Sequence, residues 1–211
     1  MTTKSITSCA FSLLELLIVI AIISILTAML FPVVQQAIIK GQAVAVGNDG
    51  KQLWYGLFAE NIERERRGQG DVWPTSADYA TSTEFFRDAI GEDWLGEDYT
   101  FSFMGAPGVP KALTVDPNEF NPENNAWCIA LDVGPGTRQE TPFMFTRNFS
   151  ASGGTLADVD GFTADTQPFG DRAGVIVTYG GAVKILTKKD LGIDFQKLFN
   201  PYNATNMIAR P

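Results

Sequence analysis

The sequence contains no histidine and only two cysteines among its 211 residues. Without histidine, neither a Ser-His-Asp nor a Cys-His catalytic arrangement can form, and His-ligated zinc and haem sites are excluded as well. Two cysteines are too few for a four-cysteine metal site or for a framework of disulfides. These absences predict a protein that is not an enzyme and holds no cofactor, with one calcium hypothesis considered below.

Basic side chains are scarce too, with 16 Lys and Arg against 24 Asp and Glu, a formal net charge of -8. A protein that binds nucleic acid needs a basic face for the phosphates, so nucleic acid is not an expected partner. Aromatic residues reach 11% of the chain, which is not the composition of a disordered protein. The length suits one membrane segment plus one modest domain, or a single domain of ordinary size.

Charge is almost absent from residues 11–31, which read FSLLELLIVIAIISILTAMLF and contain Glu15 as their one charged residue. At about 1.5 Å per residue, a helix of this length spans about 31 Å, which matches the hydrocarbon thickness of a bilayer. The run therefore predicts a transmembrane helix.

Three simpler interpretations explain this run less well. A cleavable secretory signal has an apolar core of about 7–15 residues and a small-x-small cleavage site, whereas this run is longer and Pro32 follows it. In a lipoprotein signal the apolar core precedes the cysteine, whereas here it follows Cys9. A plain single-pass anchor agrees with the hydropathy but leaves Glu15 unexplained. Insertion of an acidic side chain at the bilayer centre costs about 2.5–3.5 kcal/mol of free energy, and less near the edges. An acid in the membrane therefore favours a cationic partner.

Residues 10–15, AFSLLE, followed by the unbroken apolar run, resemble the N-terminus of type IV pilins and type II secretion pseudopilins. The resemblance implies that a prepilin peptidase cuts between Ala10 and Phe11 and methylates the new amino group of Phe11. It also implies that Glu15 pairs with the N-terminal amine of a neighbouring subunit during filament assembly. The family normally has Gly before the cut, and because Ala10 is the smallest change of side chain, we expect processing to survive.

Pro32 also matches the family, which often has a proline at this distance from the processed end. Proline removes a backbone donor and clashes with the preceding turn, so we expect a helix kink there. The domains expected are a leader at 1–10, a transmembrane and polymerisation helix at 11–31, an amphipathic helix stem at 32–67 and a globular head at 68–211.

Apolar residues recur at three- and four-residue spacing from Val33 onward, as in an amphipathic helix. Residues 47–50, Gly-Asn-Asp-Gly, are a turn signal by local chemistry, but the long helix of the resembled family favours continuity. The charged residues 60–67 are interpreted as a solvated last turn that serves solubility, with cations near the helix C-terminus. Gly68 and Gly70 are expected to end the helix.

The expected fold class is α+β, with the long helix packed against a small antiparallel sheet, as in pilins. The sequence predicts a short helix over 78–90 with Ser82 as its cap, and a loop over 105–122. Strands are predicted over 126–133 and 142–147, and the segments 174–179 and 182–186 are predicted to form a hairpin through Gly180-Gly181. The tail over 188–199 is expected to add a short helix.

Acidic residues gather in a glycine-containing segment between Asp158 and Asp171, which also holds Asp160 and Asp165. Oxygen ligands on a flexible loop can bind Ca²⁺, and some pseudopilins bind calcium in the head, so calcium is one hypothesis for this segment. The alternative is an ordinary turn-rich loop, because Asp and Gly favour turns and the EF-hand pattern is not met.

The remaining candidate residues, a cysteine and several aromatic residues, are expected to pack in the core. Removal of the leader leaves Cys128 as the one cysteine, and its position in a strand candidate predicts a buried, inert thiol. Five aromatic residues are predicted to lie in the core rather than to bind a ligand: Trp54, Tyr55, Trp73, Trp94 and Trp127.

The leading functional hypothesis is a structural subunit of a type II secretion pseudopilus or a type IV pilus-like filament. Its expected partners are the prepilin peptidase and methyltransferase, copies of itself, other pilin-like subunits and inner-membrane lipid. The chain would span the bacterial inner membrane once, with a cytoplasmic N-terminus and the head on the outer side. The alternatives are a single-pass anchored binding protein or adhesin that never polymerises, and a membrane-tethered enzyme, which the missing histidine argues against.

Overall fold

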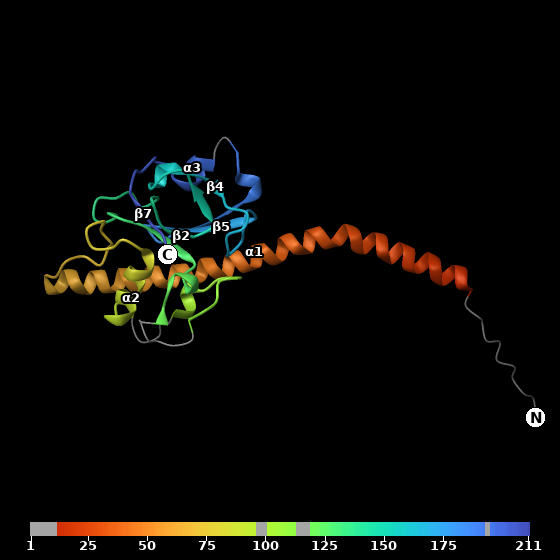
Figure 1. The fold of residues 1–211 in the computed structure, drawn as a ribbon, viewed down its shortest axis with the longest axis horizontal. Coiled ribbons are helices and arrows are strands. Elements are labelled where there is room, and N and C mark those ends of the chain that lie inside the picture. The colour runs from red at the N-terminus through yellow and green to blue at the C-terminus, as the bar shows by residue number, and fades with distance from the viewer. Residues whose placement is uncertain (1–11, 96–100, 113–118, 193–194) are drawn as a thin grey trace, which may run out of the picture. The chain divides into compact units, whose positions relative to one another are not determined.

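A computed structural model describes residues 12–95, 101–112, 119–192 and 195–211. The chain divides into two compact units, Met1–Ile38 and Ile39–Pro211, called here the N-terminal unit and the head. Helix α1 (Leu13–Arg67) contributes to both units and is the long helix that the sequence predicts (Figure 1).

The described part of the N-terminal unit is helical from Leu13 and exposed throughout, from Ser12 to Ile38. Its large apolar side chains are open on every side of the helix, with Ile20 for example 54% exposed. By length and composition α1 can cross a membrane, as expected for residues 11–31. Pro32 lies inside the helix, which continues through it, and the kink expected there stays a prediction.

The part of α1 that belongs to the head runs through residues 47–50 without a break, which confirms the expected continuity. Both glycines of this segment face the sheet. A Cβ on Gly47 would lie 2.8 Å from Cγ1 of Val183, and one on Gly50 would lie 2.5 Å from Cη2 of Trp127. Glycine costs a helix about 1 kcal/mol relative to alanine, and here it allows the close contact with the sheet.

Helix α1 ends in two backbone hydrogen bonds that close over Gly68, as the sequence predicts. Gly68 has φ of +70°, the left-handed conformation that favours glycine. Its N–H donates to the carbonyl of Glu65 at 3.1 Å, and the N–H of Gln69 donates to the carbonyl of Arg64 at 2.9 Å. This pair of bonds is a Schellman motif, which satisfies two of the last carbonyls of the helix.

The head contains a five-stranded antiparallel sheet in the order β6-β5-β2-β1-β7. Cys128 of β1 pairs with Phe145 of β2, and Phe145 pairs in turn with Ile176 of β5. The predicted strands and hairpin are confirmed, whereas the short C-terminal strand β7 was not predicted. The strands are β1 (Trp127–Ala130), β2 (Pro142–Thr146), β5 (Ala173–Thr178), β6 (Val183–Thr187) and β7 (Ile208–Ala209).

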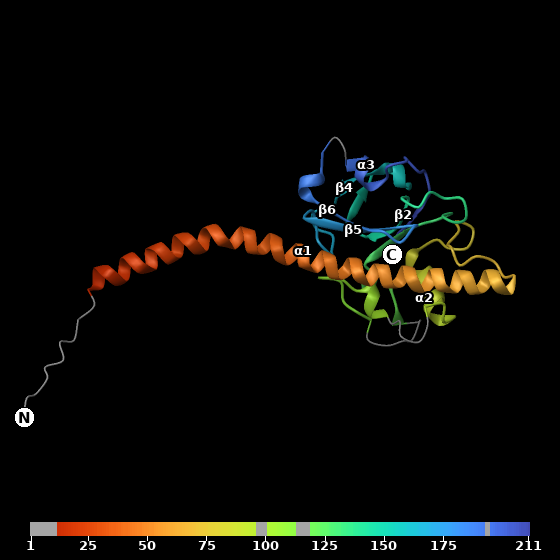
Figure 2. The ribbon, with the colours of Figure 1, turned by 180° about the vertical axis from the view of Figure 1, so that it is seen from behind.

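The sheet is covered on both faces, by α1 on one and by a second layer on the other (Figures 1 and 2). That second layer consists of the ribbon β3 (Phe149–Ala151) and β4 (Val159–Phe162) with the short helix α3 (Phe195–Phe199). Phenylalanine rings fill the space between: Phe199 lies 5.3 Å from Phe145 and 5.0 Å from Phe149, between ring centroids. The ribbon was not predicted, because its two strands are very short and β4 contains Gly161.

Helix α2 (Ser82–Gly91) begins four residues later than expected, and its cap is Thr81 rather than Ser82. The Thr81 hydroxyl accepts from the N–H of Glu84 at 3.2 Å, and the Glu84 carboxylate accepts from the N–H of Thr81 at 3.1 Å. This reciprocal capping box fixes the helix start. Ser82 instead donates its hydroxyl to the carbonyl of Trp127 at 2.7 Å, which ties α2 to the sheet.

Short 3₁₀ turns fill the connections of the head: Phe101–Met104, Pro122–Asn124, Leu156–Asp158 and Lys188–Asp190. The loop expected over 105–122 contains an isolated bridge between Ala106 and Val109, and its residues 113–118 lie outside the described ranges. The short helix expected in the tail is α3.

Candidate functional site

The N-terminal end of α1 is held by hydrogen bonds between Ser12 and the first turn. The Ser12 N–H donates to Oε2 of Glu15 at 2.9 Å, and the Leu14 N–H donates to the hydroxyl of Ser12 at 3.3 Å. Ser at the cap position with Glu three residues later is the capping-box pattern. The sequence reasoning missed this role of Glu15, although the Ser-x-x-Glu spacing was visible. Ala10 and Phe11, between which cleavage is expected, lie outside the described residues.

The other polar side chains of the apolar run also bond to their own helix. The Ser24 hydroxyl donates to the carbonyl of Ile20 at 2.7 Å, and the Thr27 hydroxyl donates to the carbonyl of Ile23 at 2.8 Å. A hydroxyl bonded to the preceding turn exposes no unsatisfied donor to lipid. Between Ser12 and Phe31, each polar side chain therefore has a partner within the helix end or the helix itself, and the rest of the exposed surface is apolar.

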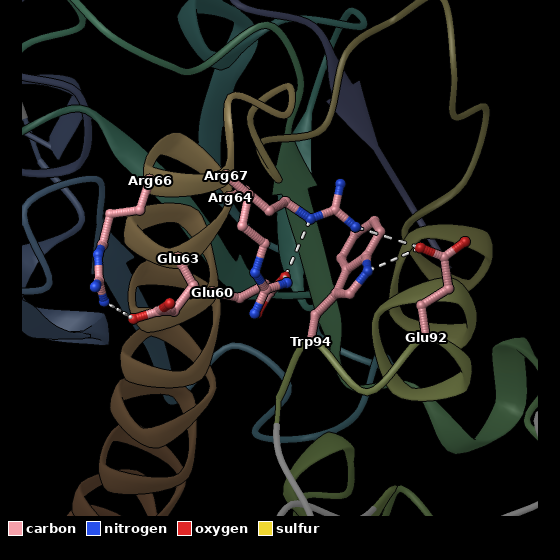
Figure 3. Close-up of polar contacts among 7 residues, drawn as sticks. All are labelled: Glu60, Glu63, Arg64, Arg66, Arg67, Glu92 and Trp94. Atoms are coloured by element: carbon pink, nitrogen blue, oxygen red, sulfur yellow. Dashed lines mark hydrogen bonds and ion pairs between the residues drawn. The ribbon is translucent and has the colours of Figure 1, made fainter.

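A charged cluster at the other end of α1 connects the helix to the segment after α2 (Figure 3). Arg64 pairs with Glu60 at 3.3 Å and with Glu92 at 3.4 Å, and its guanidinium carbon lies 4.5 Å from the ring centroid of Trp94. The indole N–H of Trp94 donates to the same Glu92 carboxylate at 2.9 Å. Arg67 also approaches Glu60, at 3.7 Å.

This cluster corrects the interpretation of residues 60–67 as a turn that serves only solubility. The side chains of Arg64 and Glu60 are 22% and 19% exposed, so both are mostly buried. Arg66 and its partner Glu63 fit the original interpretation, because their side chains are 72% and 45% exposed. The role of Arg64 depends on Trp94, which is distant in sequence, so the local charge pattern could not indicate it.

The structure does not gather the acids of residues 158–171 around a common point. No group of three or more His, Cys, Asp or Glu side chains able to hold a metal ion occurs among the described residues, which include this whole segment. Asp158 accepts from the N–H of Thr155 at 2.9 Å and from its hydroxyl at 2.7 Å. These hydrogen bonds hold the pKa of Asp158 below its ordinary value.

Two further acids of this segment also have partners within the head. Asp160, in β4, accepts from the hydroxyl of Ser150 at 2.7 Å, and Asp171 forms an ion pair with Lys188. The structure favours the alternative expected for residues 158–171, an ordinary turn-rich segment. Part of this segment forms a strand and a capped turn, and Asp158, Asp160 and Asp171 stabilise these elements.

The core residues predicted from the sequence are confirmed with one exception. Cys128 is fully buried and not bonded to another cysteine, and burial raises the pKa of its thiol to about 12. Four of the five named aromatic side chains are buried, whereas Tyr55 is 46% exposed on α1, where Lys51 lies over its ring. The thiol is an inert packing group rather than a nucleophile.

An open cleft of about 640 Å³ in the head contains the guanidinium of Arg147. This group donates to the backbone carbonyls of Pro122 at 2.9 Å, Asn125 at 3.1 Å and Gln167 at 3.3 Å. Partial burial lowers the pKa of Arg147. Through one side chain the arrangement joins the turn at residues 122–125 to the segment that contains Gln167, which is a structural function. The carboxylates of Glu123 and Asp165 also line this cleft.

Residues 7–31 match the family model described as the prokaryotic N-terminal methylation motif. This is the prepilin-type cleavage and methylation motif of pilin-like proteins, which are structural rather than catalytic. The matched residues include Ala10, Phe11 and Glu15 and end just before Pro32. Neither a curated protein nor a solved structure matches the chain.

Proposed function

We propose that this chain, a pilin-like protein by its methylation motif and its α+β architecture, is a structural subunit of a type II secretion pseudopilus or type IV pilus-like filament. Prepilin peptidase cuts it between Ala10 and Phe11 and methylates Phe11. The observation that carries this proposal is the coincidence of the motif with an apolar run, residues 11–31, whose single charge is Glu15 and which is helical from Leu13.

Before assembly, the apolar helix anchors the chain in the bacterial inner membrane. The motif and the exposed apolar surface from Leu13 to Phe31 support this anchoring, and the intrahelical bonds of Ser24 and Thr27 leave lipid-facing groups satisfied. In the proposed orientation the N-terminus is cytoplasmic and the head lies on the outer side. One helix is sufficient to cross the membrane, because the length of the apolar run matches the thickness of the hydrocarbon layer.

During assembly, the apolar surface leaves lipid and needs another apolar surface to cover it. The helices of other subunits, either copies of this chain or other pilin-like proteins, provide that surface. Cleavage creates a positive amine on Phe11, and the carboxylate of Glu15 on an adjacent subunit attracts it. In a low-dielectric environment such a pair is much stronger than in water, so it can select the correct register between subunits.

Replacement of Glu15 by Ala tests this mechanism, with Ser24→Ala as the control in the same apolar run. We expect both variants to insert into the membrane and to be cleaved before Phe11, as measured by the mass of the N-terminal peptide. Glu15→Ala should give few sheared filaments, whereas Ser24→Ala should give a normal yield. Normal filament yield from Glu15→Ala would overturn the pairing mechanism. An intact Met1 and no filaments from the unaltered chain would favour the anchored protein that does not polymerise.

A further inference from the structure

We infer that Glu15 has a second role within its own chain: it caps α1 through the N–H of Ser12, and this role is separable from its charge. The inference deepens the proposed function and rests on it, because it concerns the same carboxylate that is proposed to attract a neighbouring amine. It is carried by the two hydrogen bonds that join Ser12, Leu14 and Glu15.

The first turn of any helix has four N–H groups without an intrahelical acceptor. In α1 the first intrahelical bond runs from the N–H of Leu16 to the carbonyl of Ser12, at 3.2 Å. Of the N–H groups before it, that of Ser12 is bonded to Glu15 and that of Leu14 to the Ser12 hydroxyl. Where water is scarce, an unsatisfied N–H group costs several kcal/mol, so these two bonds matter most near lipid.

The capping bond does not exclude the proposed bond to a neighbour. It uses Oε2 of Glu15, and a carboxylate can accept hydrogen bonds through both of its oxygens. An ammonium group can therefore approach the same carboxylate while Oε2 still holds the Ser12 N–H. In this view Glu15 is a positioning residue as well as a charge, because the cap fixes its side chain against the helix end where the amine must bind.

The two roles respond differently to substitution. A capping box accepts Gln as well as Glu at this position, so Glu15→Gln should keep the cap while it removes the charge. Glu15→Ala should lose both. Ser12→Ala should keep the backbone N–H that Glu15 accepts, and lose only the hydroxyl that caps Leu14.

Amide hydrogen exchange at single-residue resolution tests the cap, on the full chain in detergent micelles. A cap contributes about 1 kcal/mol, so we expect Glu15→Ala to speed exchange of the Ser12 amide about fivefold. Glu15→Gln should keep that rate within about twofold of the unaltered chain. Ser12→Ala should speed exchange of the Leu14 amide and leave that of residue 12 slow. Equal exchange at residue 12 in Glu15→Ala and the unaltered chain would overturn the cap. Equal, fast exchange in the Gln and Ala variants would overturn its separability from the charge.

Filament yield from Glu15→Gln then separates the cap from the proposed pairing. A slow Ser12 amide together with lost filaments supports both roles. A slow Ser12 amide with normal filaments keeps the cap and overturns the attraction between Glu15 and the amine. A fast Ser12 amide in the Gln variant overturns the inference that the cap is separable from the charge, whatever the filament yield.

Discussion

The Cβ atom that Gly50 lacks would lie 2.5 Å from Cη2 of Trp127, so helix and sheet meet there at a distance that only glycine permits. Trp127 is fully buried, and its indole N–H donates to the carbonyl of Phe103 at 3.1 Å. The ring is held by this bond and by the surrounding core, so it cannot move aside freely. The contact therefore fixes how closely α1 lies on β1.

Gly50→Ala should destabilise the head, because the added methyl group overlaps the Trp127 ring. Overpacking of a core costs about 1–3 kcal/mol of unfolding free energy. Urea unfolding of the full chain in detergent, followed by tryptophan fluorescence, measures the change. Gly41→Ala is the matched control, because nothing lies within 4 Å of the added Cβ and the helix should gain up to about 1 kcal/mol. Equal stability of the two variants would contradict this account.

Arg64→Ala should lower the unfolding free energy by about 1–2 kcal/mol, because it removes a partly buried ion pair and the stacking on Trp94. Arg66→Ala, which removes the exposed pair with Glu63, should change it by less than about 0.5 kcal/mol. Denaturant unfolding of the two variants side by side checks the difference. If Arg66→Ala lowers the unfolding free energy as much as Arg64→Ala does, the contact of Arg64 with Trp94 adds no stability, and residues 60–67 serve only as a charged surface.

The thiol of Cys128 should not react with a thiol reagent in the folded chain and should react fully in denaturant. A Cys9→Ser variant leaves Cys128 as the one thiol for this measurement. Burial raises the pKa of Cys128 from 9.0 to about 12, so the folded thiol keeps its proton while the unfolded thiol ionises. Unfolding free energy should therefore fall as the pH rises from 9 towards 12, and Cys128→Ala should show a shallower fall. Rapid labelling of the folded chain would show that the thiol is accessible.

Addition of calcium or of a chelator should leave the unfolding temperature unchanged, because Asp158, Asp160 and Asp171 have protein partners and the acids of residues 158–171 do not converge. Asp158→Ala should lower that temperature through loss of the Thr155 bonds, whereas Asp165→Ala, at an exposed position, should not. The pKa of Asp158 is lowered, so its contribution is present above its ordinary value of 3.8 and is lost as the pH falls below it. A calcium-dependent rise in the unfolding temperature would contradict this assignment.

The sequence predicted most of the sheet, because strands such as β2 and β5 are runs of apolar, β-favouring residues with clear turn signals around them. It did not predict the ribbon β3–β4, where three- and four-residue strands contain polar residues and Gly161. These strands are stabilised by contact with rings such as Phe195, which lies 5.7 Å from Phe162 between centroids. Such contacts between distant segments leave little local signal.

By itself the sequence determined the apolar helix long enough to cross a membrane, the methylation motif and the position of Glu15, because these depend on run length, charge and spacing within a single helix. Only the tertiary structure showed why Gly47 and Gly50 continue α1 against their local turn signal, and that Arg64 joins the helix to Trp94. The physical reason is the same in both cases. Helix propensity differs between residue types by up to about 1 kcal/mol per residue, proline apart. Packing against a segment that is distant in sequence outweighs a difference of this size.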